Sequence, residues 1–222
     1  MTDALDLDRV AIAGIAPGPE VMWARRHLPT AGLEAYRTIR SRLALHPRQP
    51  KVVLVSSPTA GDGKSLTAVN LAGTLALGGG PVLLLDGNLS RPAVHGILGV
   101  DAEPGLAGIL SGAHTLQQGC RRVEGNRELY FLPAGSAGQG AGDLLQTSRW
   151  HDLAGVMRAS FGYVVIDAPP VGANAEYEWL ESVCDGVVLV VRPGRTARGA
   201  ARRALERMSP RPMLGIVVND CA

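Results

Sequence analysis

The sequence contains only three cysteines, and their number and spacing exclude two classes of protein. Cys120, Cys184 and Cys221 are odd in number and widely separated along the 222 residues. They fit neither the paired framework of a disulfide-stabilised domain nor a zinc-binding pattern. The five histidines are also scattered without ligand spacing. We therefore expect no transition-metal site and a reducing compartment.

Long apolar runs and a strong charge of one sign are missing as well. The longest apolar runs, such as 186–191, are far shorter than the roughly 20 residues needed to cross a bilayer. Residues 1–10 lack the pattern of a secretory signal, so we expect a cytoplasmic protein whose membrane contact is indirect. The formal net charge of +2 is too small to indicate nucleic-acid binding. The arginine-rich segment 192–207 is either a solvated face or a contact for an acidic partner or an anionic lipid.

The hydrophobic pattern predicts one domain of the α/β class, residues 31–222, behind a flexible leader, residues 1–30. The leader shows no sustained periodicity and contains Ala-Pro-Gly-Pro at 16–19. The domain carries unbroken apolar runs, which are typical of a mainly parallel sheet, here of about six or more strands, with helices on both faces. The predicted strands are 52–56, 82–86, 129–132, 163–167, 187–191 and 214–219, and the predicted helices are 33–45, 64–77, 143–159, 175–184 and 196–208.

A glycine-rich loop between a strand and a helix predicts a phosphate-binding site. The segment from Val52 to Ser65 reads Val-Val-Leu-Val-Ser-Ser-Pro-Thr-Ala-Gly-Asp-Gly-Lys-Ser. Gly61 and Gly63 let backbone N–H groups converge on phosphate oxygens at the positive end of the new helix. Lys64 would reach the terminal phosphates and Ser65 would ligate Mg²⁺. The strict motif has glycine six residues before the lysine, where this chain has Pro58, so the loop is a variant.

Two further predicted strands end in aspartate, at Asp86 and Asp167. The carboxyl ends of parallel strands gather at one edge of a sheet, so both acids are expected to face the phosphate loop. Asp167 is followed by Ala-Pro-Pro, a stiff turn suited to holding a carboxylate toward a metal-bound water. Asp86 would act as the polarising or basic group. Either acid alone could equally well cap a loop.

With these motifs, the chain resembles the bacterial tyrosine kinases of capsule and exopolysaccharide synthesis, over about residues 33–219. Four segments carry the resemblance: 34–40, 57–65, 85–92 and 165–170. It implies ATP and Mg²⁺ as cofactors, Lys64, Asp86 and Asp167 as catalytic residues, and Ser65, Asp86 and Asp167 as metal ligands. The implied nucleotide-binding residues are Ala60, Gly61, Asp62, Gly63, Lys64, Ser65, Leu66, Arg91 and Asn219.

The resemblance also implies partners. Glu34, Arg37 and Arg40 would form a motif through which copies of the chain build a homo-oligomer. Relatives work with a membrane protein that regulates polysaccharide chain length, also called a co-polymerase. This chain is therefore expected to lie in the cytoplasm, peripheral at the inner membrane through that partner, and to bind no nucleic acid.

Two departures from the family pattern leave alternatives open. The relatives have an aspartate where this chain has Asn88, and an arginine where it has Ser90. An amide oxygen attracts a hard cation less strongly than a carboxylate does, so kinase activity is expected to be weakened or lost. The first alternative is a non-catalytic, ATP-dependent oligomeric scaffold. The second, a partitioning or division-site type ATPase, would need a lysine where this chain has Thr59.

Overall fold

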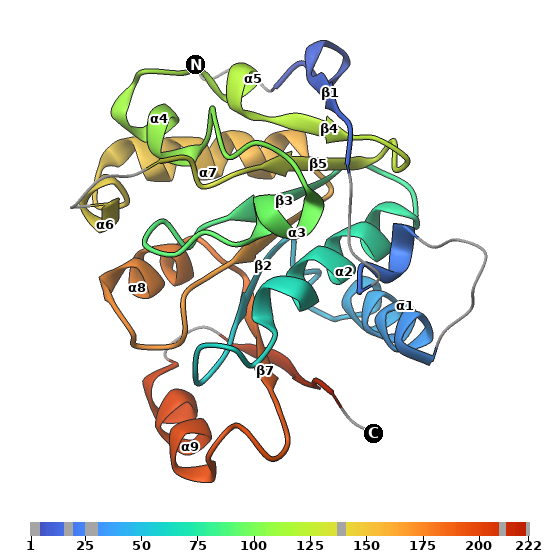
Figure 1. The fold of residues 1–222 in the computed structure, drawn as a ribbon, viewed down its shortest axis with the longest axis vertical. Helices are drawn as coiled ribbons and strands as arrows, with labels where there is room; N and C mark the ends of the chain where they lie inside the picture. Colours follow the sequence, from blue (N-terminus) through green and yellow to red (C-terminus); the bar gives the residue numbers. More distant parts are fainter. Residues whose placement is uncertain (1–4, 16–19, 25–30, 137–140, 209–211, 221–222) are drawn as a thin grey trace.

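A central sheet of eight strands forms the framework of this computed structural model, which describes residues 5–15, 20–24, 31–136, 141–208 and 212–220 (Figure 1). The strands are β1 (Ala11–Ala13), β2 (Val52–Ser56), β3 (Val82–Asp86), β4 (Arg121–Val123), β5 (Leu129–Leu132), β6 (Tyr163–Asp167), β7 (Gly186–Val191) and β8 (Met213–Val218). Their spatial order is β1-β4-β5-β3-β6-β2-β7-β8. Neighbouring strands are parallel except for β4 and β5, which are antiparallel.

The six predicted strands are confirmed, each to within one residue at either end. The strands β1 and β4 were not predicted. Each has three residues, which is too short for a periodic pattern to stand out from a loop. The α/β class and the mainly parallel sheet are thus confirmed.

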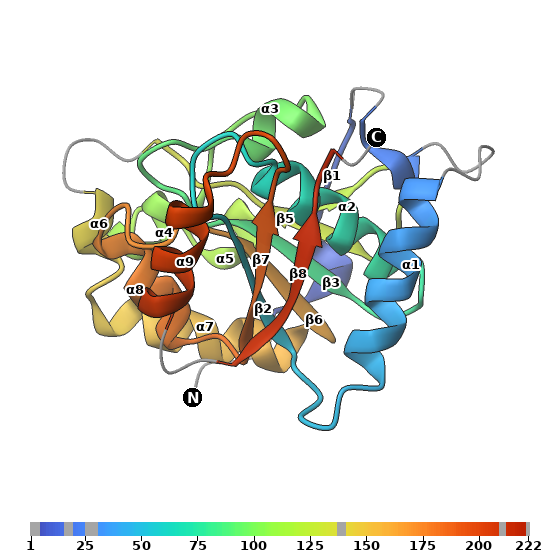
Figure 2. The same cartoon turned by 90° about the horizontal axis from the view of Figure 1, so that it is seen from below.

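Helices cover both faces of this sheet (Figure 2). The α-helices are α1 (Ala31–Ala44), α2 (Lys64–Ala76), α3 (Val94–Leu98), α4 (Leu106–Ser111), α5 (Leu116–Gly119), α6 (Ala141–Leu144), α7 (Ser148–Ser160), α8 (Ala175–Ser182) and α9 (Arg198–Arg207), and η1 (Leu7–Arg9) and η2 (Met22–Ala24) are 3₁₀ turns. Side chains of α1, α2 and α3 belong to one apolar cluster, and those of α4, α7, α8 and α9 to the other. The single helix predicted over 143–159 is instead α6 and α7, because Thr147 adopts an extended conformation between them.

Parts of residues 1–30, which the sequence pattern predicted to be a flexible leader, pack on α2. The indole of Trp23 is buried and donates a hydrogen bond to the carbonyl of Val69, at 3.1 Å. Asn70 accepts from the backbone N–H of Met22, at 2.7 Å, and donates to the carbonyl of Glu20, at 3.0 Å. Residues 1–4, 16–19 and 25–30 lie outside the described structure, so the boundary at residue 31 stays a prediction.

The strand register places the two predicted acids side by side at the centre of the sheet. Every residue of β2 and β3 is buried, and Asp86 at the end of β3 is the register partner of Asp167 at the end of β6. Asp167 is also paired with Val55 of β2, whose strand leads into the phosphate loop. Within the described residues, no helix combines the length and the apolar character that a membrane span requires.

Candidate functional site: a phosphate-binding loop beside two buried carboxylates

The loop between β2 and α2 has the backbone that an anion site requires. Gly61 and Gly63 have φ of 86° and 97°, a left-handed region that glycine adopts without steric cost. Helix α2 begins at Lys64, and no described side chain caps its amino end. Its first N–H groups and the positive end of its dipole are thus available to an anion. The segment predicted to bind phosphate thus has a backbone conformation that is compatible with anion binding.

The loop is held in this shape by Asp62, whose buried carboxylate points into the loop. It accepts hydrogen bonds from the backbone N–H and the hydroxyl of Thr59, at 2.9 and 2.8 Å, and from the hydroxyl of Thr196, at 2.8 Å. The side-chain amide of Asn219 donates to the carbonyl of Asp62, at 3.0 Å. The loops that follow β7 and β8 thus brace the phosphate loop. Asp62 was predicted as a nucleotide contact. Because its carboxylate is engaged by Thr59 and Thr196, only its backbone could contact a nucleotide in this geometry.

Gly63 is the position in the loop where added bulk is tolerated least. A Cβ atom there would lie 2.1 Å from Nδ2 of Asn219, and its φ already disfavours any L side chain. We expect Gly63→Ala to weaken Mg-ADP binding at least about tenfold, because the loop must shift before it can receive a phosphate. Isothermal titration of the variant against wild type checks this. Gly79→Ala is the control, since Gly79 has a similar φ of 92° with open space around it, and it should bind normally.

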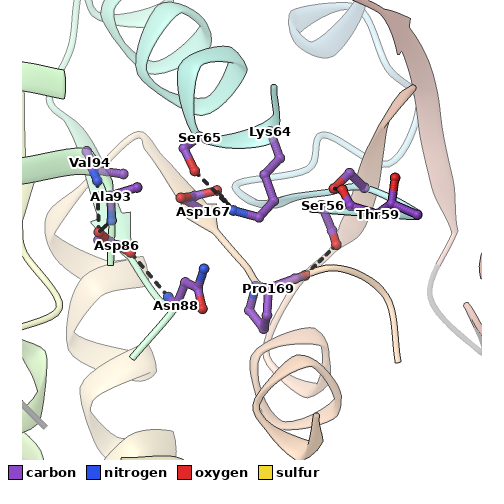
Figure 3. A network of polar contacts seen from close by, with 11 residues as sticks. Ser56, Thr59, Lys64, Ser65, Asp86, Asn88, Ala93, Val94, Asp167 and Pro169 are labelled. Atoms are coloured by element: carbon purple, nitrogen blue, oxygen red, sulfur yellow. Dashed lines mark hydrogen bonds and ion pairs between the residues drawn. The ribbon is translucent and has the colours of Figure 1, made fainter. Parts of the chain in front are cut away.

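Lys64, Ser65 and Asp167 converge beside the loop (Figure 3). The ammonium Nζ of Lys64 lies 3.0 Å from the hydroxyl Oγ of Ser65 and 3.7 Å from Oδ1 of Asp167. Asp167 is fully buried, and neither of its carboxylate oxygens has a hydrogen-bond partner among the described residues. Burial raises the pKa of Asp167 to about 7. The positive charge of Lys64 opposes this rise, and the negative charge of Asp86 adds to it. A buried carboxylate in this state favours any cation that enters the site.

Asp86 lies beside this cluster but is engaged differently. Its Oδ2 accepts hydrogen bonds from the N–H groups of Ala93 and Val94, both at 3.0 Å, and its Oδ1 accepts from the N–H of Asn88, at 3.2 Å. Burial raises the pKa of Asp86 to about 6, although these three backbone bonds oppose the rise. Asp86 therefore orders the turn between β3 and α3, whereas Asp167 accepts no hydrogen bond from a described residue and has only the ion pair with Lys64.

The two departures from the family pattern lie on this same turn. Asn88 is buried, and Figure 3 shows its side chain between Asp86 and Lys64. The hydroxyl of Ser90 donates a hydrogen bond to the carboxylate of Glu176, which is itself buried in the first turn of α8. Glu176 thus ties α8 to the turn that carries Asn88, a contact that was not predicted. Sequence spacing gave no sign of it because the two residues are 86 positions apart.

The other predicted nucleotide contacts surround the loop in different ways. Ala60 and Arg91 are exposed and Leu66 is half-buried. Asn219, another of the predicted nucleotide contacts, lies against Gly63. Arg195 was not predicted at the loop, yet its Nη2 is 2.5 Å from a Cβ placed on Gly61. Its position could have been inferred from the sequence, because Arg195 follows β7 closely and β7 lies next to β2, the strand that leads into the loop.

The predicted oligomerisation motif is divided in the structure. Glu34 and Arg37 form an ion pair on the outer face of α1, with 58% and 47% of their side chains exposed. Arg40 instead packs against α2, where its guanidinium donates a hydrogen bond to the carbonyl of Thr74, at 3.2 Å. Glu34 and Arg37 are accessible to a partner, and Arg40 holds the two helices together.

The donor set at the loop fits a hard divalent cation. Ser65 supplies a hydroxyl oxygen and Asp167 two free carboxylate oxygens, and such oxygen ligands are those that Mg²⁺ prefers. The described residues contain no group of three or more His, Cys, Asp and Glu side chains that is suited to a metal ion. A cation held here would thus depend on few protein ligands and on its own waters or a bound phosphate, which is usual for Mg²⁺.

Proteins of known sequence include close relatives of this chain. No family model matches the sequence. The chain is 34% identical to the tyrosine-protein kinase YwqD of Bacillus subtilis over 190 residues, which make up 84% of this chain and 80% of that protein. It is 32% identical to the putative tyrosine-protein kinase EpsB of Ralstonia solanacearum over 193 residues, which make up 85% of this chain but only 25% of that longer protein.

The fold has a close counterpart among solved structures. The crystal structure of the chimerical protein CapA2B2 matches with a TM-score of 0.86 and 23% identity, and the match covers 97% of this chain and 96% of that one. At this level of identity the match supports the fold alone. It extends over almost the whole chain, so the sheet and its helices follow one common arrangement from end to end.

Proposed function

Because this chain belongs to the bacterial tyrosine kinase family, we propose that it binds Mg-ATP at the phosphate loop and transfers the terminal phosphoryl group to tyrosine. The observation that carries the proposal is Asp167, a fully buried carboxylate 3.7 Å from Lys64 Nζ, whose oxygens have no hydrogen-bond partner among the described residues. Lys64 offsets only part of the free-energy cost of burying this charge, because the pKa of Asp167 is still raised, and a further cation bound at the carboxylate would offset more of it. The site is thus built for a charged ligand.

Each residue has a part in this proposal. The N–H groups of the loop and of the first turn of α2 receive the phosphate oxygens, and Lys64 places its positive charge on the terminal phosphates. Ser65 and Asp167 hold Mg²⁺, and Asp86 orders the neighbouring turn and adds negative charge. When bound, Mg²⁺ neutralises charge on the phosphates and lowers the barrier to transfer. Positioning and charge stabilisation account for most of this reaction, so these groups suffice in principle.

A second candidate function is favoured by Asn88. Its neutral amide stands where the family has a carboxylate, which weakens the attraction for Mg²⁺. The chain would then bind ATP and sense it as an oligomeric scaffold, without transferring phosphate to protein. The kinase remains the better supported candidate because Lys64, Ser65 and Asp167 are assembled in one cluster. The relatives named as tyrosine-protein kinases likewise favour it over a division-site type ATPase.

The biological setting is proposed from family membership. We place the protein in the cytoplasm, at the inner membrane through a chain-length regulator, in the synthesis and export of capsule or exopolysaccharide. The exposed Glu34 and Arg37 on α1 support contacts between copies of the chain. Arg40 supports the same assembly indirectly, by fixing α1 on α2. Measuring the mass in solution, with and without Mg-ATP, tests this part of the proposal.

The deciding experiment replaces Asn88. Purified wild type and Asn88→Asp are incubated with Mg-ATP and a tyrosine-containing peptide, with and without the cytoplasmic segment of a co-polymerase. Phosphotyrosine and released phosphate are both measured. We expect Asn88→Asp to raise phosphotyrosine formation about tenfold and to lower the Mg²⁺ concentration required, because it adds a carboxylate next to Asp86, the register partner of Asp167.

The double variant Lys64→Ala, Asn88→Asp is the control, and it should lose that gain. Phosphotyrosine in wild type that depends on Lys64 would establish a kinase despite Asn88. Its absence in wild type together with a gain in Asn88→Asp would favour the scaffold. Absence from both proteins, with no released phosphate and no nucleotide binding, would contradict both functions.

A further inference from the structure

A cleft beside the phosphate loop is not used by the site described above. It has a volume of about 250 Å³ and lies between the start of the loop, at Pro58 and Thr59, the segment 170–173 and one face of α9. Figures 1 and 2 show α9 at the same end of the sheet as the loop between β2 and α2. We call it the α9 cleft.

The α9 cleft is joined firmly to the nucleotide site. Its segment 170–173 begins three residues after Asp167. The hydroxyl of Ser56 donates a hydrogen bond to the carbonyl of Pro169, at 2.7 Å, and the N–H of Val171 donates to the carbonyl of Ser57, at 2.9 Å. A ligand in the cleft would therefore sit at a fixed position relative to Lys64 and Asp167.

The cleft is positively charged. Its lining contains two arginines from α9, Arg203 and Arg207, and no acidic residue. Both side chains are exposed, and no ion pair in the described part of the chain includes either of them. Among the described residues, Arg207 donates one hydrogen bond, to the carbonyl of Gly172 at 3.1 Å, and its other guanidinium donors have no partner there. The small side chains of Ala200 and Ala204 lie beside the two arginines on the helix and leave room for a ligand.

None of the four tyrosines of this sequence is placed to accept phosphate at this site. Tyr36, Tyr130 and Tyr177 are buried. Tyr163 begins β6, the strand that Asp167 ends, so it lies about 13 Å away, at the opposite edge of the sheet. An acceptor tyrosine must therefore come from outside the residues that the structure describes, and the polypeptide segment that carries it needs a surface beside the phosphate loop on which to bind.

We infer that the α9 cleft binds an acidic segment of the acceptor polypeptide, with Arg203 and Arg207 holding carboxylates that flank the target tyrosine. Arginine suits this task because its planar guanidinium forms paired hydrogen bonds with a carboxylate. The inference rests on the proposed kinase function for the identity of the ligand, but it concerns binding and is tested without catalysis. An anionic membrane surface is the competing occupant. It is less favoured because Leu205 is the one large apolar side chain described as exposed on α9, and membrane-bound helices insert a wider apolar face.

The test measures binding of a fluorescein-labelled peptide that has one tyrosine flanked by glutamates. The protein is saturated with Mg²⁺ and a non-hydrolysable ATP analogue, and fluorescence anisotropy is recorded at low salt. A second peptide carries glutamines in place of the glutamates. We expect the glutamate peptide to bind at least about tenfold more tightly, and the double variant Arg203→Gln, Arg207→Gln to lose that preference.

Two further variants make the result specific. Arg202→Gln is the matched control, because Arg202 is on the same helix but pairs with Glu206 at 3.4 Å, and it should retain the preference. Arg203→Glu should instead favour a peptide whose tyrosine is flanked by lysines, which a merely structural role for Arg203 would not produce. Thermal unfolding confirms that each variant is folded.

Three results would overturn the inference. In the first, the glutamate and glutamine peptides bind equally well to wild type. In the second, the double variant loses affinity for Mg-ADP as strongly as for the peptide. In the third, the double variant loses binding to phosphatidylserine vesicles but keeps its preference for the glutamate peptide. If the protein binds the peptide as expected yet forms no phosphotyrosine, the kinase function is contradicted, but the cleft is still supported as a binding site for acidic segments.

Discussion

Replacing Lys64 by alanine is expected to reduce ATP turnover and phosphotyrosine formation by about 100-fold to 1,000-fold, the usual effect of removing one group that stabilises transition-state charge. Lys64 is buried at the amino end of α2 and points its ammonium toward Ser65 and Asp167. No other described lysine lies near the loop to take its place. Steady-state assays of released phosphate, run beside a phosphotyrosine immunoassay, measure both activities.

Lys51→Ala is the matched control for this prediction. The sequence contains two lysines: Lys51 directly precedes β2, and Lys64 begins α2 after the loop that follows β2. Lys51 is exposed, so its loss should leave turnover unchanged. Similar turnover in Lys64→Ala and wild type would show that the phosphate loop is not where ATP reacts. A loss confined to Lys64→Ala would support the proposed site.

Asp167→Asn is expected to stabilise the nucleotide-free protein at pH 8, by up to about 4 kcal/mol, although it should abolish activity. Burial raises the pKa of Asp167 from 3.8 to about 7, and each unit of such a shift corresponds to about 1.4 kcal/mol. Above pH 7 the folded protein holds a buried negative charge that the unfolded chain exposes to water. Asparagine removes that cost while keeping the side-chain volume.

The sign of the pH dependence follows from proton binding. Between about pH 4 and pH 7 the folded state holds a proton on Asp167 that the unfolded state has released. Its contribution to the free energy of unfolding is therefore present at low pH and is lost as the pH rises through 7. Asp86, with its pKa raised to about 6, acts in the same direction. The advantage of Asp167→Asn should thus shrink as the pH is lowered from 8 to 4.5, as measured by urea unfolding.

Asp185 provides a control of opposite sign. Partial burial raises its pKa, but hydrogen bonds from Arg158 and from the N–H groups of Val52 and Lys51 outweigh this and lower the pKa below its usual value. Asp185→Asn should therefore destabilise the protein at pH 8 and by the same amount down to about pH 5, and the loss should shrink only as the pH falls below 3.8, the usual pKa of an aspartate, through the lowered pKa of the folded state. Equal pH profiles for the two variants would contradict the conclusion that the buried charge of Asp167 destabilises the nucleotide-free protein.

The sequence was sufficient to predict the parts of the site that lie on buried strands. β2, β3 and β6 are unbroken apolar runs that end in a loop or an acid, and parallel strands bring their carboxyl ends to one edge. This is why Lys64, Asp86 and Asp167 could be grouped from strand patterns alone. The glycine-rich pattern also indicated the loop between β2 and α2, although the left-handed φ of Gly61 and Gly63 was not predicted.

The contacts that could not be predicted depend on side chains that come from distant parts of the chain. Asp62 bonds to Thr196, 134 positions away, and Ser90 bonds to Glu176, 86 positions away. Nothing in the local pattern marks either pair. The sequence also did not show that Asp86 accepts hydrogen bonds whereas Asp167 accepts none from a described residue. The N–H groups of Ala93 and Val94 reach Asp86 only because of the turn that follows β3.

The scarcity of lysine makes the ammonium of Lys64 chemically addressable. Of the two lysine side chains in the sequence, that of Lys51 is exposed to solvent and that of Lys64 is buried at the loop, where the terminal phosphates are expected. An acylating reagent carried on a nucleotide would therefore form one amide bond in the binding site, with little competition from other side-chain amines. Such a reagent would act as an occupancy probe by mass spectrometry and as a starting point for covalent inhibitors of this protein.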